Sequence, residues 1–169
     1  MDLEGKVAIV TGGSIGIGTA IALDLASNGA DVAINYRKHE AEANKVVEKV
    51  REVGRRGLAV RADVSSFEDA QKMVEKVKQT FGRIDILVNN AGVNWDGVVW
   101  KMSEEQWDQV IDIDLKGCFN YIRAVSPIFR EQNSGKIVNM TSINALRGKF
   151  GQANYSAAKA GIIGLTKAV

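Results

Sequence analysis

Short apolar segments rich in β-branched residues alternate with longer helical segments along nearly the whole chain. Strands are predicted at residues 6–10, 31–35, 58–61, 84–88 and 136–140. Helices are predicted in a segment ending at Ser27, over residues 40–53, 67–81 and 103–130, and through Tyr155. Connections of this length favour parallel strands, because the chain must cross over to return to the same end of the sheet. The sequence therefore predicts one α/β domain over residues 1–169, with a doubly wound parallel sheet between two helical layers and ligands at the carboxyl ends of its strands.

The charge balance of the chain argues against polyanionic partners. The sequence holds 22 Lys and Arg against 20 Asp and Glu, and the two signs are interspersed. We therefore expect no binding to nucleic acid or to an anionic membrane. No apolar run approaches the length of a membrane span and no secretory signal is recognisable, so a cytoplasmic protein is expected. Cys118 is the only cysteine, which excludes an intrachain disulfide and a cysteine-based metal cluster, and no metal site is predicted.

A glycine-rich turn, TGGSIGIG, follows the first predicted strand directly and precedes the first predicted helix. Gly12 and Gly16 let the backbone turn tightly and approach a pyrophosphate, and Gly18 lets the helix pack closely on the strand. The start of the helix adds free N–H groups and a favourable dipole for an anion. The predicted nucleotide contacts in this turn are Gly12, Ser14, Ile15, Gly16, Ile17 and Gly18.

A tyrosine and a lysine stand one helical turn apart in NYSAAKAG, and a serine lies upstream at the end of GKIVNMTS. A phenol is a weak acid at neutral pH, so a catalytic tyrosine needs a positive charge beside it. Lys159, four residues after Tyr155, supplies that charge, and Ser142 is placed to hold a substrate oxygen against the phenol. The trio predicts proton transfer at a carbonyl or alcohol oxygen, whereas the Tyr-Lys pair alone would also suit a solvated helix face.

These motifs together resemble the short-chain dehydrogenase/reductase family, and the resemblance runs from residue 2 to residue 169. The glycine turn matches, as do an Asp-Val pair at Asp63 and Val64, the NNAG motif after the predicted strand 84–88, and the Ser-Tyr-Lys trio in order and spacing. The resemblance implies a Rossmann fold, with nucleotide contacts also at Asp63, Val64, Asn90, Ala91 and Gly92, and at Tyr155 and Lys159. Within the family, the chain is most similar to 3-oxoacyl-[acyl-carrier-protein] reductases and to acetoacetyl-CoA reductases.

The activity implied by the resemblance is hydride transfer between a nicotinamide and a carbonyl carbon. Tyr155 would pass the proton, Lys159 would make the phenol more acidic and hold the nicotinamide ribose, and Ser142 would bind the reacting oxygen. The implied substrate is a 3-oxoacyl thioester of acyl carrier protein or of CoA, with acyl carrier protein as a partner, in a homodimer or homotetramer. Two alternatives remain open: a sugar or polyol dehydrogenase, and a dinucleotide-binding fragment without turnover.

The end of the second predicted strand, INYRKHE, bears on the choice of cofactor. A carboxylate there would bind the ribose hydroxyls of NAD, whereas a basic residue would pair with the 2′-phosphate of NADP. This chain has no carboxylate at the tip, and Arg37 offers a guanidinium suited to a phosphate. Many NADP-dependent relatives also carry an Arg in the glycine turn, where this chain has Ile15. We favour NADP over NAD, with a merely solvated turn as the alternative reading of Arg37.

Three features depart from the family or extend it. The family's fourth catalytic position is an Asn thought to order a water in a proton relay, and this chain has Asp114 there, from which we expect reduced or pH-shifted activity. The chain ends at Val169, so the last strands of the family fold and one wall of the nicotinamide site are expected to be missing, in a truncated chain or a piece of a longer one. Trp95, Trp100 and Trp107 follow NNAG, and we expect them to pack the loop onto the next helix, with substrate binding as the alternative.

Overall fold

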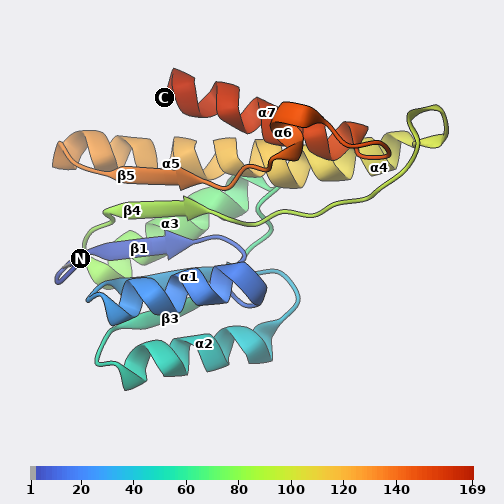
Figure 1. The fold of residues 1–169 in the computed structure, drawn as a ribbon. Coiled ribbons are helices and arrows are strands. Elements are labelled where there is room, and N and C mark those ends of the chain that lie inside the picture. The colour runs from blue at the N-terminus through green and yellow to red at the C-terminus, as the bar shows by residue number, and fades with distance from the viewer. Residues whose placement is uncertain (1–2) are drawn as a thin grey trace.

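A parallel sheet of five strands forms the centre of the molecule, in the order β3-β2-β1-β4-β5, in a computed structural model that describes residues 3–169. Helices cover both faces (Figure 1), so the three-layer doubly wound architecture is confirmed. The chain starts with β1 (Val7–Val10) in the middle and builds β2 and β3 outward on one side before crossing to β4 and β5 on the other. The point where the order reverses lies between β1 and β4, where doubly wound sheets bind ligands.

The predicted elements are found, with small shifts at their ends. The strands after β1 are β2 (Asp31–Tyr36), β3 (Gly57–Arg61), β4 (Ile86–Asn89) and β5 (Lys136–Asn139). The helices are α1 (Gly16–Ser27), α2 (Glu40–Glu52), α3 (Phe67–Phe81), α4 (Glu104–Val110), α5 (Gly117–Gln132), α6 (Asn144–Arg147) and α7 (Ala153–Ala168). The short α6, and a 3-10 turn η1 (Val99–Lys101), lie where no regular element was predicted.

The single helix predicted over residues 103–130 is wrong, because three segments occupy this region. Ser103 and Gln106 form a reciprocal capping box that starts α4. A π-helical segment η2 (Ile111–Lys116) then widens the helix by an extra residue per turn before α5 resumes the ordinary pitch. The widened turn buries Ile113 and Asp114.

The core lies in two layers, one on each face of the sheet. On one face, α1 and α2 pack mainly small and β-branched side chains against β1 and β2. On the other, α3 and α5 pack larger side chains, including Met73, Phe81 and Tyr121, against β1 and β4. All residues of β1 and β2 are buried, which explains why β1 is apolar throughout and why β2 is largely apolar rather than alternating.

Two buried aspartates anchor the amino ends of the strands. Asp85, before β4, accepts hydrogen bonds from the Val7 amide at 3.0 Å and from two nitrogens of Arg83 at 2.8 and 2.6 Å. Asp31, the first residue of β2, accepts from the amide of Arg56 at 2.8 Å and from its Nε at 2.7 Å. Burial opposes the ionisation of both carboxyls, but the arginines and amides outweigh it and hold the pKa of Asp31 and of Asp85 below the ordinary value.

Across residues 3–169, the helices are all too short or too polar to cross a membrane.

Candidate active site

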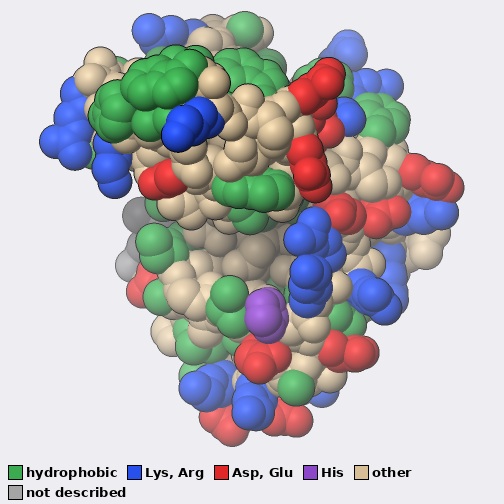
Figure 2. All heavy atoms as spheres, turned by 90° about the vertical axis from the view of Figure 1, so that its right-hand side faces the viewer, with side chains coloured by type: hydrophobic (Ala, Val, Ile, Leu, Met, Phe, Trp, Pro, Cys, Tyr) green, Lys and Arg blue, Asp and Glu red, His purple; other side chains and the backbone are tan. Residues whose placement is uncertain are grey.

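Two adjoining clefts open at the carboxyl ends of the strands, with volumes of about 370 and 400 Å³. The first is lined by the predicted residues of the glycine turn other than Gly16, by Arg37, Asp63 and Val64, and by residues 90–92. The second is lined by Asp114, Ser142, Tyr155 and Lys159. Ile17, Asn90 and Gly92 line both clefts, so the two form one continuous hollow, seen near the middle of this face in Figure 2. The structure thus brings together every predicted site residue except Gly16, which lines neither cleft.

The glycine turn leaves the start of α1 open to a ligand. Ile15 precedes the helix in an extended conformation and provides no side-chain cap, so the first amides of α1 have no partner within the helix. Gly18 has no room for a side chain, because a Cβ there would overlap the carbonyl of Gly12 and lie 2.6 Å from Nδ2 of Asn90. The backbone approaches closely at this point, and the free amides face a cleft suited to an anion such as a pyrophosphate.

The NNAG motif is fastened to the glycine turn through Thr11. The hydroxyl of Thr11 accepts hydrogen bonds from the amides of Asn90 at 2.9 Å and of Ala91 at 3.0 Å. In return, Nδ2 of Asn90 donates to the carbonyl of Thr11 at 2.9 Å. These bonds join the ends of β1 and β4, so the floor shared by the two clefts is held rigidly.

Basic residues surround the far end of the first cleft, where β2 ends. Arg37, Lys38 and His39 line it, and Nη1 of Arg37 lies 3.4 Å from Oδ2 of Asp63. Burial alone would raise the pKa of Asp63, but hydrogen bonds from Ser65 and the Arg37 guanidinium lower it below its ordinary value. Asp63 is therefore an anion that keeps the half-exposed Arg37 at the edge of the cleft.

Tyr155 and Lys159 lie one turn apart on α7, and both side chains face the second cleft. The Lys159 ammonium lies 5.6 Å from the centroid of the Tyr155 ring and donates a hydrogen bond to the Met140 carbonyl at 3.1 Å. Ser142 lies just beyond β5, in the turn into α6. Its Oγ accepts from the amide of Asn144 at 3.2 Å, which fixes the hydroxyl at the wall of the cleft.

A buried carboxylate, that of Asp114, forms an ion pair with Lys159 at the second cleft. Oδ2 of Asp114 lies 3.1 Å from Nζ of Lys159, while Oδ1 accepts a hydrogen bond from the amide of Val93 at 2.8 Å. Asp114 has no exposed surface and Lys159 is only 5% exposed. A Cβ at Gly92 would lie 2.9 Å from Oδ2 of Asp114 and 3.3 Å from Nζ of Lys159, so the glycine of NNAG makes room for this ion pair.

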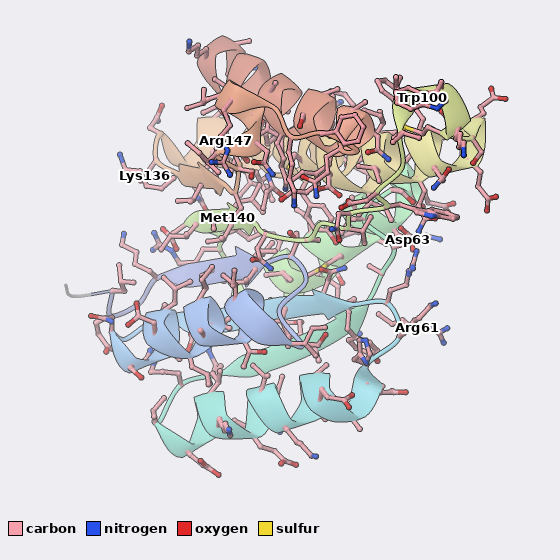
Figure 3. The ribbon with its side chains drawn as sticks, turned by 45° about the vertical axis from the view of Figure 1, so that its right-hand side comes forward. Arg61, Asp63, Trp100, Lys136, Met140 and Arg147 are labelled. Atoms are coloured by element: carbon pink, nitrogen blue, oxygen red, sulfur yellow. The ribbon has the colours of Figure 1, made fainter. Side chains whose placement is uncertain are left out.

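Apolar side chains gather above the hollow on the face shown in Figure 2. Trp100, labelled in Figure 3, is 71% exposed, and its ring centroid lies 6.2 Å from that of Phe150, which is 80% exposed. Trp95 and Trp107 are also exposed. The prediction that the tryptophans pack the loop onto the helix is therefore wrong for Trp100, which extends toward solvent.

Several polar residues that hold the site were not predicted. Asn35, buried within β2, accepts from the Gly12 amide at 2.6 Å and donates to the Ala62 carbonyl at 2.8 Å, which links three strand ends. Asn154 donates to the carbonyls of Trp95 at 3.0 Å and Gln106 at 2.8 Å, which fastens the start of α7 to the loop after β4 and to α4. A polar residue inside an apolar strand was the available signal for Asn35; nothing local marked Asn154.

The residues present fit a dinucleotide rather than a metal. Free amides at the start of α1, a close backbone approach at Gly18 and basic side chains at the end of β2 suit the phosphates. Within residues 3–169, no three His, Cys, Asp or Glu side chains are grouped to hold a metal ion.

Comparisons with known proteins agree with this geometry. The sequence model of the family described as short chain dehydrogenase matches residues 6–169. The chain is 48% identical over 162 residues to the 3-oxoacyl-[acyl-carrier-protein] reductase FabG of Staphylococcus epidermidis, covering 96% of this chain and 66% of that protein. It is 43% identical over 164 residues to nodulation protein G of Azospirillum brasilense, covering 97% and 67%.

A solved structure is also closely similar. It is described as a candidate short-chain alcohol dehydrogenase from Sinorhizobium meliloti, with a TM-score of 0.95 and 35% identity, over 99% of this chain and 66% of that one. The chain therefore spans about two thirds of the length of the curated relatives it matches.

Proposed function

The chain belongs to the short-chain dehydrogenase family, and on that premise we propose that it is an NADP-dependent oxidoreductase that reduces the keto group of a 3-oxoacyl thioester. The observation that carries the proposal is the second cleft, where Tyr155, Lys159 and Ser142 line one wall next to the nucleotide cleft.

Each residue of the trio has a distinct part in the reaction. When bound, the nicotinamide supplies the hydride. Tyr155 donates its phenolic proton to the substrate oxygen, and Ser142 donates a hydrogen bond to the same oxygen as negative charge develops on it. Lys159, anchored by the Met140 carbonyl, holds a positive charge beside the phenol ring and stabilises the phenolate that remains.

The basic end of the first cleft supports NADP over NAD. Arg37 has its guanidinium at the edge of the cleft, and Lys38 and His39 line the same end. A guanidinium pairs with a phosphate through two parallel hydrogen bonds, which suits the 2′-phosphate of NADP. Tyr36 is the last residue of β2, so no carboxylate stands at the strand end where it would select NAD.

The substrate class and the carrier come from the relatives. Proteins of Staphylococcus and Synechocystis that share 44–48% identity with this chain are 3-oxoacyl-[acyl-carrier-protein] reductases. We extend that substrate to this chain, with the acyl group presented by acyl carrier protein or by CoA. A homodimer or homotetramer formed through η2, α5 and α7 completes the proposal, and light scattering of the purified protein tests it.

Consumption of NADPH with acetoacetyl-CoA, followed by the absorbance of the nicotinamide, tests the activity. Tyr155→Phe removes the proton donor while keeping the ring, and turnover should fall by about 100-fold or more. Ser156→Ala is the matched control, because it deletes a neighbouring hydroxyl that has no hydrogen-bond partner among the described residues, and it should leave turnover unchanged.

Three results would replace the proposal. Nucleotide binding without turnover on any β-keto thioester would assign the chain to non-catalytic binding. Preferential oxidation of sugars or polyols would assign it to the dehydrogenase alternative. A Tyr155→Phe variant as active as the native protein would remove the phenol from the mechanism.

A further inference from the structure

Asp114 adds a negative charge to the second cleft, next to the positive charge of the Ser-Tyr-Lys trio. Its carboxylate lies 3.1 Å from the Lys159 ammonium, and both side chains are buried. Lys159 supplies the positive charge beside Tyr155. A negative charge this close to the ammonium cancels much of the field that the phenol experiences.

The carboxylate is held in place by its surroundings. The Val93 amide fixes Oδ1 at 2.8 Å, and the π-helical turn η2 directs the side chain inward. Oδ2 faces Lys159 but receives no hydrogen bond of good geometry from the described residues, so the contact is an ion pair without a second donor. Within residues 3–169, Lys159 is the one charged side chain that acts on Asp114.

Few other charges face the pair. Cys118 on α5 lies close, but burial raises the pKa of its thiol to about 11, so the thiol is neutral over the working range. On α4, Glu104, Glu105 and Asp108 are exposed, as is Arg147 on α6. From the loop after β4, Asp96 accepts two hydrogen bonds from Gln152 at 3.0 and 3.1 Å. The net charge behind the phenol is therefore set by Asp114 and Lys159 together.

We propose that Asp114 is a positioning residue that neutralises Lys159, keeps the Tyr155 phenol protonated to higher pH, and so biases this site toward carbonyl reduction. A reductase needs the protonated phenol as its acid, whereas alcohol oxidation needs the phenolate as its base. An uncompensated ammonium favours the phenolate, and the carboxylate removes that preference. The bias toward reduction rests on the proposed function, but the ion pair and its effect on the phenol do not depend on the substrate.

The protonation of Asp114 itself fits this assignment. Burial raises the pKa of Asp114 above its ordinary value, against the attraction of Lys159 and the Val93 amide. As the pH falls and the carboxyl becomes neutral, the ammonium loses its partner. The compensation is therefore present at higher pH, where the phenol would otherwise lose its proton.

Phenol ionisation in the cofactor-free protein is the direct test, and it needs no turnover. The chain has three tyrosines, and burial raises the pKa of Tyr36 and of Tyr121, so their phenolates form late. In a near-ultraviolet absorbance titration, the phenolate signal that disappears in Tyr155→Phe belongs to Tyr155. The pH at which this phenolate forms in the native protein is the reference for the Asp114 variants.

Asp114→Asn removes the charge with little change of shape and should move the phenolate signal to lower pH by about one unit. The alkaline limb of the pH profile for NADPH-dependent reduction should move down with it, and oxidation of the corresponding alcohol should gain relative to reduction. Asp112→Asn is the matched control, since it removes a half-exposed carboxylate of the same segment that pairs with Lys116. It should move neither signal.

The remaining outcomes are distinguishable. Asp114→Glu keeps the negative charge and should retain the alkaline limb of the native pH profile. A merely structural role of Asp114 would not predict this result. If Asp114→Asn fails to fold, Asp114→Ser provides a second neutral variant. An unmoved phenolate in a folded neutral variant would overturn the inference even if the protein reduces thioesters. Absence of turnover with a shifted phenolate would instead reject only the proposed function.

Discussion

The two ends of the parallel sheet use their polar side chains in opposite ways. At the amino ends, Asp31 and Asp85 are surrounded by arginines and backbone amides that satisfy their carboxylates fully. At the carboxyl ends, the start of α1 has no side-chain cap and one oxygen of Asp114 has a counter-ion but no good hydrogen-bond donor within residues 3–169. Polar groups whose hydrogen bonds are all made within the protein stabilise the fold, whereas polar groups that lack a partner are available to a ligand. The amino ends of the strands therefore serve stability, and the carboxyl ends of the same strands serve function.

Asp85→Asn should destabilise the fold at the amino ends of the strands and leave the clefts intact. The change removes a charged acceptor from Arg83 and the Val7 amide, so the free energy of unfolding should fall by about 2–3 kcal/mol. Urea unfolding measures this loss. Asp112→Asn removes a half-exposed carboxylate and should cost no more than about 0.5 kcal/mol. An equal loss in both variants, or a loss of nucleotide affinity by the folded Asp85→Asn protein, would contradict the division between the two ends.

Acid should weaken the same end of the sheet. The pKa of Asp31 and of Asp85 is lower in the folded state than the ordinary value of 3.8. Their contribution is therefore complete above the unfolded pKa and is lost as the pH falls through the folded pKa. Each carboxylate should lose about 1.4 kcal/mol for every unit by which its pKa is lowered. Urea unfolding at a series of pH values should show a steeper acid decline in the native protein than in Asp85→Asn, and parallel curves would count against this prediction.

Gly18→Ala probes the carboxyl end. A Cβ would overlap the Gly12 carbonyl and approach Asn90, so the glycine turn must shift, at a cost of about 1–2 kcal/mol in stability and with loss of NADPH binding. Thermal unfolding and NADPH fluorescence measure the two effects. Gly164→Ala on α7 is the control, because its Cβ would meet open space, and it should stabilise by about 0.5–1 kcal/mol. Unchanged NADPH affinity in Gly18→Ala would place the nucleotide elsewhere.

Arg37→Ala should have the smallest effect and sharpen the comparison. Loss of the guanidinium should weaken NADPH about tenfold and leave NADH affinity unchanged, because the 2′-phosphate alone would use it. Arg61→Ala removes a nearby exposed arginine that does not line the cleft, and Figure 3 labels its position at the end of β3. Fluorescence titration of both variants with both nucleotides separates a phosphate contact from a general charge effect, and equal weakening in the two would favour the latter.

Patterns within the sequence predicted the architecture because strands and helices depend on local periodicity. The bounds of α3 were predicted correctly, and the other strands and long helices shifted by a few residues at most, apart from the region after Trp100. A π-helical turn has no distinct hydrophobic period over six residues, so η2 could not be predicted.

Side-chain contacts between distant elements were harder to predict. The substitution at Asp114 was evident in the sequence, but its direct pairing with Lys159 depends on how η2 packs against α7. The roles of Asn35 and Asn154 depend on which carbonyls the folded chain leaves nearby. Motif spacing predicts which residues gather in a site, whereas the bonds between them follow from tertiary packing.

The π-helical turn also makes the site sensitive to chain length rather than only to residue identity. Deleting one residue from η2 would allow an ordinary helix to run from α4 into α5, a change that secondary-structure propensity alone would favour. The same deletion would remove the wide turn that buries Asp114. Asp114 would then lose its contacts with Val93 and Lys159, so the ion pair depends on the number of residues in this segment as well as on the carboxylate.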